Sequence, residues 1–257
     1  MTRRKRSDAI GTIAWTERTG GVLRRDEQAA LALPLLRGHR AIIAGRIAMA
    51  LKLHAGRRTS IDPSSLTPPD SALAREAEAG ARALLSPAVL NHSYRSFAWG
   101  AALAAVDQVA FDRELLYVAA LFHDTGIPSP VPDVDFTVRS AAMVRPVLAA
   151  HDVALADQEV VTNAIALHHT PGVDLSHGPE AFLLSAGAAV DVFGLRSNHV
   201  PDFVRSAVVL RYPRLGFKHE FAGLFRAEAR RVPHGRAWYL HRFAMSDITI
   251  RLAAFRE

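Results

Sequence analysis

The chain has 257 residues, of which 49% are hydrophobic, and a formal net charge of +6. This length is ample for one large core with appended helices. The chain has no cysteine, which excludes disulfides, thiolate zinc sites and cysteine nucleophiles and leaves histidine and carboxylate as the strong metal ligands. No apolar run is long enough to cross a bilayer, and the charged start MTRRKRSDAI precedes no apolar signal segment. We therefore expect a cytoplasmic protein that does not enter a membrane.

The charges are unevenly distributed along the chain. Residues 72–195 hold 6 basic and 14 acidic side chains, whereas residues 196–257 hold 12 basic and 5 acidic ones. The acidic middle suits the binding of a cation and argues against a polyphosphate site, since phosphate recognition usually recruits several arginines or lysines. For the basic C-terminal segment we favour a solvated face over a surface for a partner or an anion. Nucleic-acid binding is not expected.

Apolar residues recur at helical spacing and alternating strand patterns are missing, which predicts an all-α fold. Residues 1–25, with the basic cluster Arg3–Arg6, are expected to be a flexible N-terminus. A helix is predicted from Asp26 to about Leu53, with interruptions near Pro34 and Gly38, followed by a Pro- and Ser-rich connector over residues 56–69.

A second helix is predicted after the connector, with Asp70 or Ser71 as its cap. Pro, Gly and polar residues then separate eight further stretches of helical periodicity. They cover residues 87–108, 112–124, 136–151, 157–169, 179–193, 200–211, 218–231 and 236–255. Pro146 is expected to kink or split the third of these.

Four segments place metal-ligand side chains in an apolar helical context: LNHSYRSFAWG (90–100), AALFHDTG (119–126), AIALHHT (164–170) and SAGAAVDVFG (185–194). A buried carboxylate or imidazole must be paired, hydrogen-bonded or bound to a metal, because a lone buried charge costs several kcal/mol. Each residue alone is weak evidence, since a single histidine on an apolar face is more often a hydrogen-bonded core residue. Metal binding gives one cause for His92, His123, Asp124 and Asp191 together.

The adjacent His123 and Asp124 are the firmest part of this prediction. They lie where a helical pattern meets Thr125, Gly126 and Pro128, so both are expected near a helix C-terminus, where their side chains can converge on one ion.

This order of residues resembles the pattern H…HD…D of the HD-domain superfamily of metal-dependent hydrolases. The likeness covers about residues 67–195. The stretches PPDSALAREAEA, NHSYRSFAWG, RELLYVAALFHDTG and AIALHH are similar to the subgroup that includes cyanamide hydratases. The resemblance implies an HD domain over residues 67–197, an N-terminal helical extension over 26–66, and C-terminal helices over 198–257 packed on that domain.

The resemblance also implies roles for single residues. His92, His123, Asp124 and Asp191 would be the metal ligands, and His168 matches a histidine often found at such sites. Asn91 and Arg95 would support the ligands or face the substrate, although an internal salt bridge is an equal alternative for Arg95. His169 has no clear counterpart in the family, and it is a candidate for the same supporting position or for local packing.

The predicted cofactor is a divalent metal ion, for which Zn²⁺, Fe²⁺, Mn²⁺ and Co²⁺ are all chemically reasonable. We favour one ion, and a second is conceivable if His168 joins the ligands. Such an ion lowers the pKa of a bound water and supplies hydroxide at neutral pH, which Asp124 or His168 would orient while moving protons. The expected activity is hydrolysis or hydration of a small molecule with a nitrile-, cyanamide-, ester- or amide-like group.

Three alternatives remain open from the sequence. They are a phosphohydrolase acting on a phosphomonoester or nucleotide, an HD-type oxygenase with two irons, and a regulatory HD module without catalysis. The apolar residues of the helices after position 200 are expected to be mostly core, with a homodimer interface as the less favoured alternative.

Overall fold

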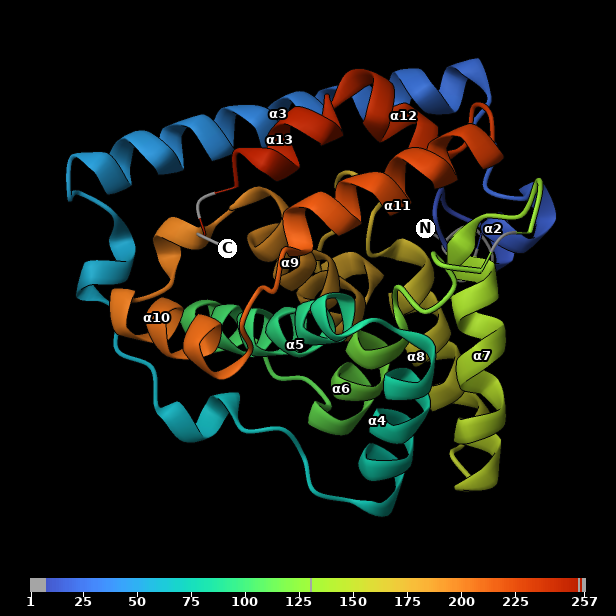
Figure 1. The fold of residues 1–257 in the computed structure, drawn as a ribbon, viewed down its shortest axis with the longest axis horizontal. Helices are drawn as coiled ribbons and strands as arrows, with labels where there is room; N and C mark the ends of the chain where they lie inside the picture. Colours follow the sequence, from blue (N-terminus) through green and yellow to red (C-terminus); the bar gives the residue numbers. More distant parts are fainter. Residues whose placement is uncertain (1–7, 130, 254, 256–257) are drawn as a thin grey trace.

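The computed structural model describes residues 8–129, 131–253 and 255 and consists of helices joined by turns (Figure 1). Among these residues no strand is formed, and one isolated bridge joins Val22 to Gly235. The predicted all-α class is therefore confirmed. Within the same part of the chain, no helix combines the length and the apolar character that crossing a bilayer requires.

The α-helices follow the predicted pattern closely in the middle of the chain. Their bounds are α2 (Ile13–Thr19), α3 (Arg25–Ala50), α4 (Ala72–Leu84), α5 (Pro87–Asp107), α6 (Arg113–Phe122), α7 (Phe136–Ala150), α8 (Leu155–Leu167), α9 (Pro179–Phe193), α10 (Asp202–Arg211), α11 (Phe217–Arg231), α12 (Arg236–Phe243) and α13 (Ser246–Arg251). Single 3₁₀ turns lie at Ala55–Arg58, Pro63–Leu66, Leu175–His177 and Ser197–His199.

Helices α5 and α9 pack against each other at the centre of the molecule. Their backbones approach closely at two glycines, since a Cβ added to Gly187 would lie 2.1 Å from the carbonyl oxygen of Ser96, and one added to Gly100 would lie 2.8 Å from that of Leu183. The two helices therefore run antiparallel. One turn beyond the Ser96–Gly187 contact, the same crossing brings His92 on α5 to Asp191 on α9.

Local signals explain most helix boundaries. Ser71, rather than Asp70, caps α4 by accepting a hydrogen bond from the backbone N–H of Ala74, and Ser86 caps α5 just before a proline at the first helical position. The predicted interruptions of α3 near Pro34 and Gly38 are wrong, because the helix is continuous through both residues. Helix α7 likewise continues through Pro146 without a split.

The ends of the chain differ more from the prediction. Helix α2 was not predicted, and it buries Trp15, whose indole N–H donates to Glu27 of α3 (2.9 Å). The predicted last helix is two helices, α12 and α13, because Met245 between them adopts a left-handed conformation with a φ of 48°. The cluster Arg3–Arg6 lies outside the described residues. Helices α3, α12 and α13 lie together along one side of the molecule, next to α11 (Figure 1). We call these four helices the covering layer.

Candidate metal centre

His92, His123 and Asp124 meet in the interior of the fold and form a group of ligand atoms close enough to hold one metal ion. The Nε2 atoms of His92 and His123 lie 3.2 Å apart. Asp124 Oδ2 lies 3.4 Å from Nε2 of His92 and 3.2 Å from Nε2 of His123. All three side chains are buried. The sequence therefore predicted correctly that these residues come together, although they stem from two helices and the turn that follows α6.

His123 and His168 occupy the same kind of position at the ends of two neighbouring helices. Each is the residue that ends its helix, α6 or α8, and each places its Nδ1 2.7 Å from the carbonyl oxygen three residues earlier, Ala120 or Ile165. Carbonyls in the last turn of a helix lack a partner within the helix, so they are free to accept these bonds. Because a carbonyl can only accept, Nδ1 carries the proton in the neutral form of both rings, which leaves Nε2 with a lone pair.

His92 has the same tautomer for a different reason. Its Nδ1 donates to Asp191 Oδ2 (2.8 Å), which directs Nε2 towards His123 and Asp124. A carboxylate behind a histidine is the arrangement that orients imidazole ligands in many metal sites.

The environment of Asp124 tests whether these residues fit a cation. Both of its carboxylate oxygens are buried and have no hydrogen-bond partner among the described residues. His168 approaches from the other side, with its Nε2 3.5 Å from Asp124 Oδ1. Imidazole lone pairs and a carboxylate that face one another without a donor are unfavourable unless a positive charge lies between them. The residues therefore fit a divalent metal ion.

The acid–base properties of the group agree with this interpretation. Burial is the main effect on the His92 ring and lowers its pKa to about 4, so the ring is neutral near pH 7. Burial also opposes ionisation of Asp124, but a positive charge on the facing His123 ring, with a smaller contribution from His168, outweighs it and holds the pKa of Asp124 well below its usual range. Burial likewise disfavours protonated His123, yet the charge of Asp124 raises the pKa of that ring. Asp124 thus requires a positive partner, which either a proton on His123 or a metal ion supplies.

Asp191 lies behind His92 and binds cations of the protein itself. Its oxygens accept hydrogen bonds from Arg95 Nε (2.8 Å) and Nη2 (2.9 Å) and from Arg214 Nη1 (2.9 Å), in addition to the bond from His92. After burial, which opposes ionisation, these two arginines have the largest effect on the pKa of Asp191 and keep it well below the usual range. In this arrangement Asp191 orients a ligand, and its predicted role as a direct ligand remains a prediction.

Two other predicted residues, Arg95 and Asn91, bind the loop that precedes α11. Of the two alternatives for Arg95, the internal salt bridge is the one found, and Arg95 also donates to the carbonyl of Tyr212 (2.9 Å). Asn91 donates to the carbonyl of Pro213 (2.7 Å) and does not line the cavity described below. Both side chains thus bind the loop that carries Arg214. The sequence analysis did not identify Arg214, because nothing near it in the chain resembles a site motif.

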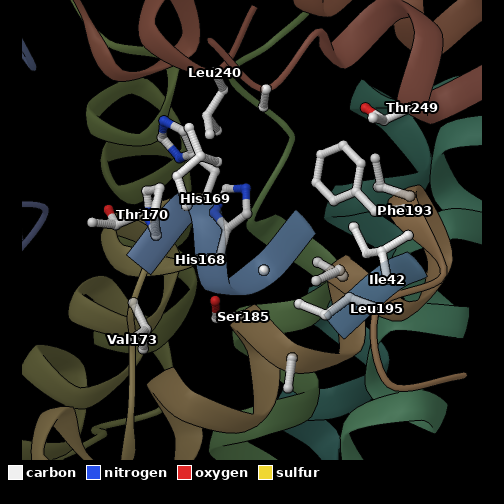
Figure 2. A pocket seen from close by; sticks show the side chains of 18 of the residues that line it. Ile42, His168, His169, Thr170, Val173, Ser185, Phe193, Leu195, Leu240 and Thr249 are labelled. Atoms are coloured by element: carbon white, nitrogen blue, oxygen red, sulfur yellow. The ribbon is translucent and has the colours of Figure 1, made fainter. Parts of the chain in front are cut away.

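A cavity of about 240 Å³ adjoins the candidate metal centre and is lined by His92, Asp124, His168 and His169. Figure 2 shows this cavity with His168 and His169 at its wall. The His169 ring is almost fully buried, and neither of its nitrogens has a hydrogen-bond partner among the described residues. Its closest charged neighbour is Asp135, at 3.8 Å. Apart from these residues the lining is mainly apolar, and it comes from α9 on one side and from the covering layer on the other.

Comparison with known protein families agrees with the geometry. Residues 89–188 match the model of the HD domain. The match includes His92, His123, Asp124 and His168, and it ends three residues before Asp191. No curated protein matches the chain.

Proposed function

We propose that this protein is a metal-dependent hydrolase or hydratase whose reaction takes place at the group formed by His92, His123 and Asp124. The single observation that carries the proposal is the buried Asp124 carboxylate without a hydrogen-bond donor, faced by imidazole nitrogens that carry lone pairs. The HD domain over residues 89–188 supports the proposal, since this family consists mostly of metal-dependent hydrolases.

His92 and His123, through Nε2, and Asp124, through its carboxylate, would hold one ion of Zn²⁺, Fe²⁺, Mn²⁺ or Co²⁺. When bound, such an ion lowers the pKa of a coordinated water from about 16 towards about 7 and so supplies hydroxide at neutral pH. Asp191 would act from behind His92, by fixing the tautomer and direction of that ring.

His168 is the group that moves the proton. It lines the cavity, and its Nε2 carries a lone pair 3.5 Å from Asp124 Oδ1. Burial lowers the pKa of His168, so the ring is unprotonated near pH 7 and can accept a proton from the attacking water. It can then return that proton to the atom of the substrate that gains electrons. Asp124 would orient the water through its second oxygen.

A nitrile-, cyanamide-, amide- or ester-like group is the proposed reacting part of the substrate. The likeness of the segments around His92, Asp124 and His168 to cyanamide hydratases supports this choice. The homodimer and the cytoplasmic location remain predictions.

The test measures metal content and turnover in the same preparations. We expect elemental analysis to find one divalent metal per chain, and the variants His123→Ala and Asp124→Ala to lose both the metal and the hydrolysis or hydration of small nitriles, amides and esters. His219→Ala is the matched control, because His219 is exposed on α11 and far from any ligand in the chain. Turnover that persists in Asp124→Ala without bound metal would contradict the proposal.

A further inference from the structure

We propose that the cavity selects an uncharged substrate with a compact apolar body, an aryl or branched alkyl group, whose reacting group faces His92, Asp124 and His168. This inference rests on the proposed function, because it assigns the rest of the substrate to the space beside the candidate metal centre. It follows from the walls of the cavity, its size and the positions of the charged residues.

One wall is a single face of α9. Phe182, Ala186, Ala189 and Phe193 all line the cavity, and their spacing of three or four residues puts them on the same side of the helix. The two alanines between the phenylalanines leave the space that the cavity occupies. Because His92 and His168 line the same cavity, a molecule that fills it contacts both this face and the metal-site histidines.

The opposite wall comes from the covering layer and is equally apolar. Ile42 of α3, Phe221 and Phe225 of α11, and Leu240 of α12 contribute their side chains. Burying an apolar group is worth about 25 cal/mol for each Å² removed from water, so an apolar body gains affinity from both walls. A strongly hydrated body would lose its water without replacement.

The size of the cavity sets the size of the body. At about 240 Å³ it is larger than the cavity of about 150 Å³ that holds benzene in an engineered protein core. It is smaller than the roughly 300–1,000 Å³ that is usual for pockets of drug-sized ligands. One ring or branched alkyl group with a small reacting group therefore fits.

The charges of the protein's own side chains disfavour a phosphate-bearing substrate. Among the described residues that line the cavity, Arg196 is the one arginine or lysine, and it forms two bonds with Asp107 (2.7 and 2.9 Å). The arginines closest to the metal-site residues are bound as well, Arg95 and Arg214 to Asp191 and Arg236 to Asp135. A phosphate would thus meet no arginine or lysine that is available to bind it, although such groups usually recruit several.

Two polar groups remain to orient an uncharged substrate. Both nitrogens of the His169 ring lack a hydrogen-bond partner among the described residues, and the hydroxyl-bearing Ser185 of α9 lines the cavity. Each can make one hydrogen bond to a neutral amide, ester or nitrile. One hydrogen bond does not offset the loss of water from a fully charged group, so these two groups suit a neutral one.

Binding of toluene tests the apolar body without requiring any turnover. We expect saturable binding of toluene to the purified protein, measured by calorimetry, both before and after removal of metal by a chelator. Ala189→Leu fills the cavity from α9 and should weaken this binding by about tenfold or more, since a packed space tolerates added methylenes poorly. Ala44→Leu is the matched control, because Ala44 is exposed on α3, and it should leave the binding unchanged.

A second variant, on the opposite wall, shows whether weaker binding in Ala189→Leu comes from a filled cavity or from misfolding. Ile42→Phe narrows the cavity from the opposite wall at a half-exposed position and should weaken toluene binding in the same way. Phenyl phosphate should bind to the metal-free protein at least about tenfold more weakly than toluene, because Asp124 repels it. Absence of saturable toluene binding, equal binding in all variants, or tighter binding of phenyl phosphate would overturn the inference.

The outcomes also separate this inference from the proposed function. If the metal is present in one copy per chain and toluene does not bind, the substrate class is wrong and the metal-dependent reaction stands. If toluene binds in the cavity but neither metal nor metal-dependent turnover is found, the apolar site stands and the proposed function fails.

Discussion

The two sides of the cavity are built in different ways. On one side, α5, α6, α8 and α9 bury histidines, carboxylates and arginines at full depth, and α5 and α9 touch through their backbones at Gly100 and Gly187. On the other side, the covering layer contributes apolar side chains, and its helix α3 packs less deeply. Helix α3 has 26 residues, of which three are buried, while Leu36, Ile43 and Ile47 are more than half exposed.

Because of this difference, we assign the proposed metal binding to the first side of the cavity and the fit of the substrate to the second. The metal-site residues are held by hydrogen bonds to neighbouring groups and by the close contact of α5 with α9, so their positions are strictly fixed. The covering layer contacts the cavity with residues such as Ile42, which is partly exposed and can change in size with little effect on the core. We expect substitutions on the first side to cost stability or metal, and substitutions on the second to change which molecules bind.

The largest effect is expected for Asp191→Ala. This change leaves Arg95 and Arg214 buried without their carboxylate, which costs about 3–5 kcal/mol of unfolding free energy, measured by urea denaturation. If Asp191 orients His92 from behind, metal affinity should fall by about 10–100-fold rather than vanish. Asp202→Ala, which removes an exposed carboxylate, is the control. Complete loss of metal in a folded Asp191→Ala protein would instead make Asp191 a direct ligand.

A smaller loss of stability is expected for Gly187→Ala. The added Cβ would lie 2.1 Å from the carbonyl oxygen of Ser96, so α5 and α9 must move apart, and overpacking of this kind typically costs about 1–3 kcal/mol. Thermal unfolding followed by circular dichroism measures the effect. Because the same shift separates His92 from Asp191, metal affinity should fall together with stability. An unchanged melting temperature would show that the helix contact is looser than described.

A pH-dependent effect is expected for Asp135→Asn, which breaks the ion pair between the residue preceding α7 and Arg236 of α12 (3.0 Å). Burial opposes ionisation of Asp135, but Arg236 outweighs it and lowers the pKa of Asp135 from 3.8 to about 2. A lowered carboxyl pKa stabilises the fold above the unfolded-state value and ceases to do so as the pH falls through the folded-state value. The variant should therefore lose about 2 kcal/mol at pH 7, and its deficit should shrink between pH 4 and 2.

Urea unfolding at several pH values measures this deficit. Asp157→Asn, which changes an exposed carboxyl on α8, should differ little from the unaltered protein. A deficit of Asp135→Asn that stays constant down to pH 2 would mean that the ion pair with Arg236 does not stabilise the fold.

The smallest effect has the opposite sign. Gly223 lies inside α11 in the covering layer, and a Cβ there would meet no atom within 4 Å. Gly223→Ala should therefore stabilise the protein by about 0.5–1 kcal/mol, because alanine loses less conformational entropy in a helix. Thermal unfolding of Gly223→Ala and Gly187→Ala under the same conditions compares the effect of one substitution on the stability of the two regions. Equal destabilisation by both changes would contradict the difference between the two sides.

The sequence predicted the first region better than the second. Helical periodicity and caps located α4 to α9 to within a few residues, and the position of His123 and Asp124 at a helix end could be read from the Thr125, Gly126 and Pro128 that follow. The convergence of His92, His123 and Asp124 was also predicted, because ligand side chains in apolar segments must share a partner once they are buried, and one metal ion satisfies all three.

The rest depended on contacts between segments that are distant in the chain. Arg214 reaches Asp191 from a loop, and the covering layer completes a cavity that no single segment encodes. The helix break at Met245 could not be predicted, because no glycine or proline marks it in the sequence. Helix α2 is too short to be stable by itself and is stabilised by the contact of Trp15 with Glu27.

The central claim is that one divalent ion binds between His92, His123 and Asp124. Its most direct test is a titration of metal-free protein with Co²⁺, followed by calorimetry and by the visible absorption of the bound ion. We predict one site per chain in the unaltered protein and in His219→Ala, and no such site in His92→Ala, His123→Ala or Asp124→Ala. Stoichiometric Co²⁺ binding that is unchanged in these three folded variants would contradict it.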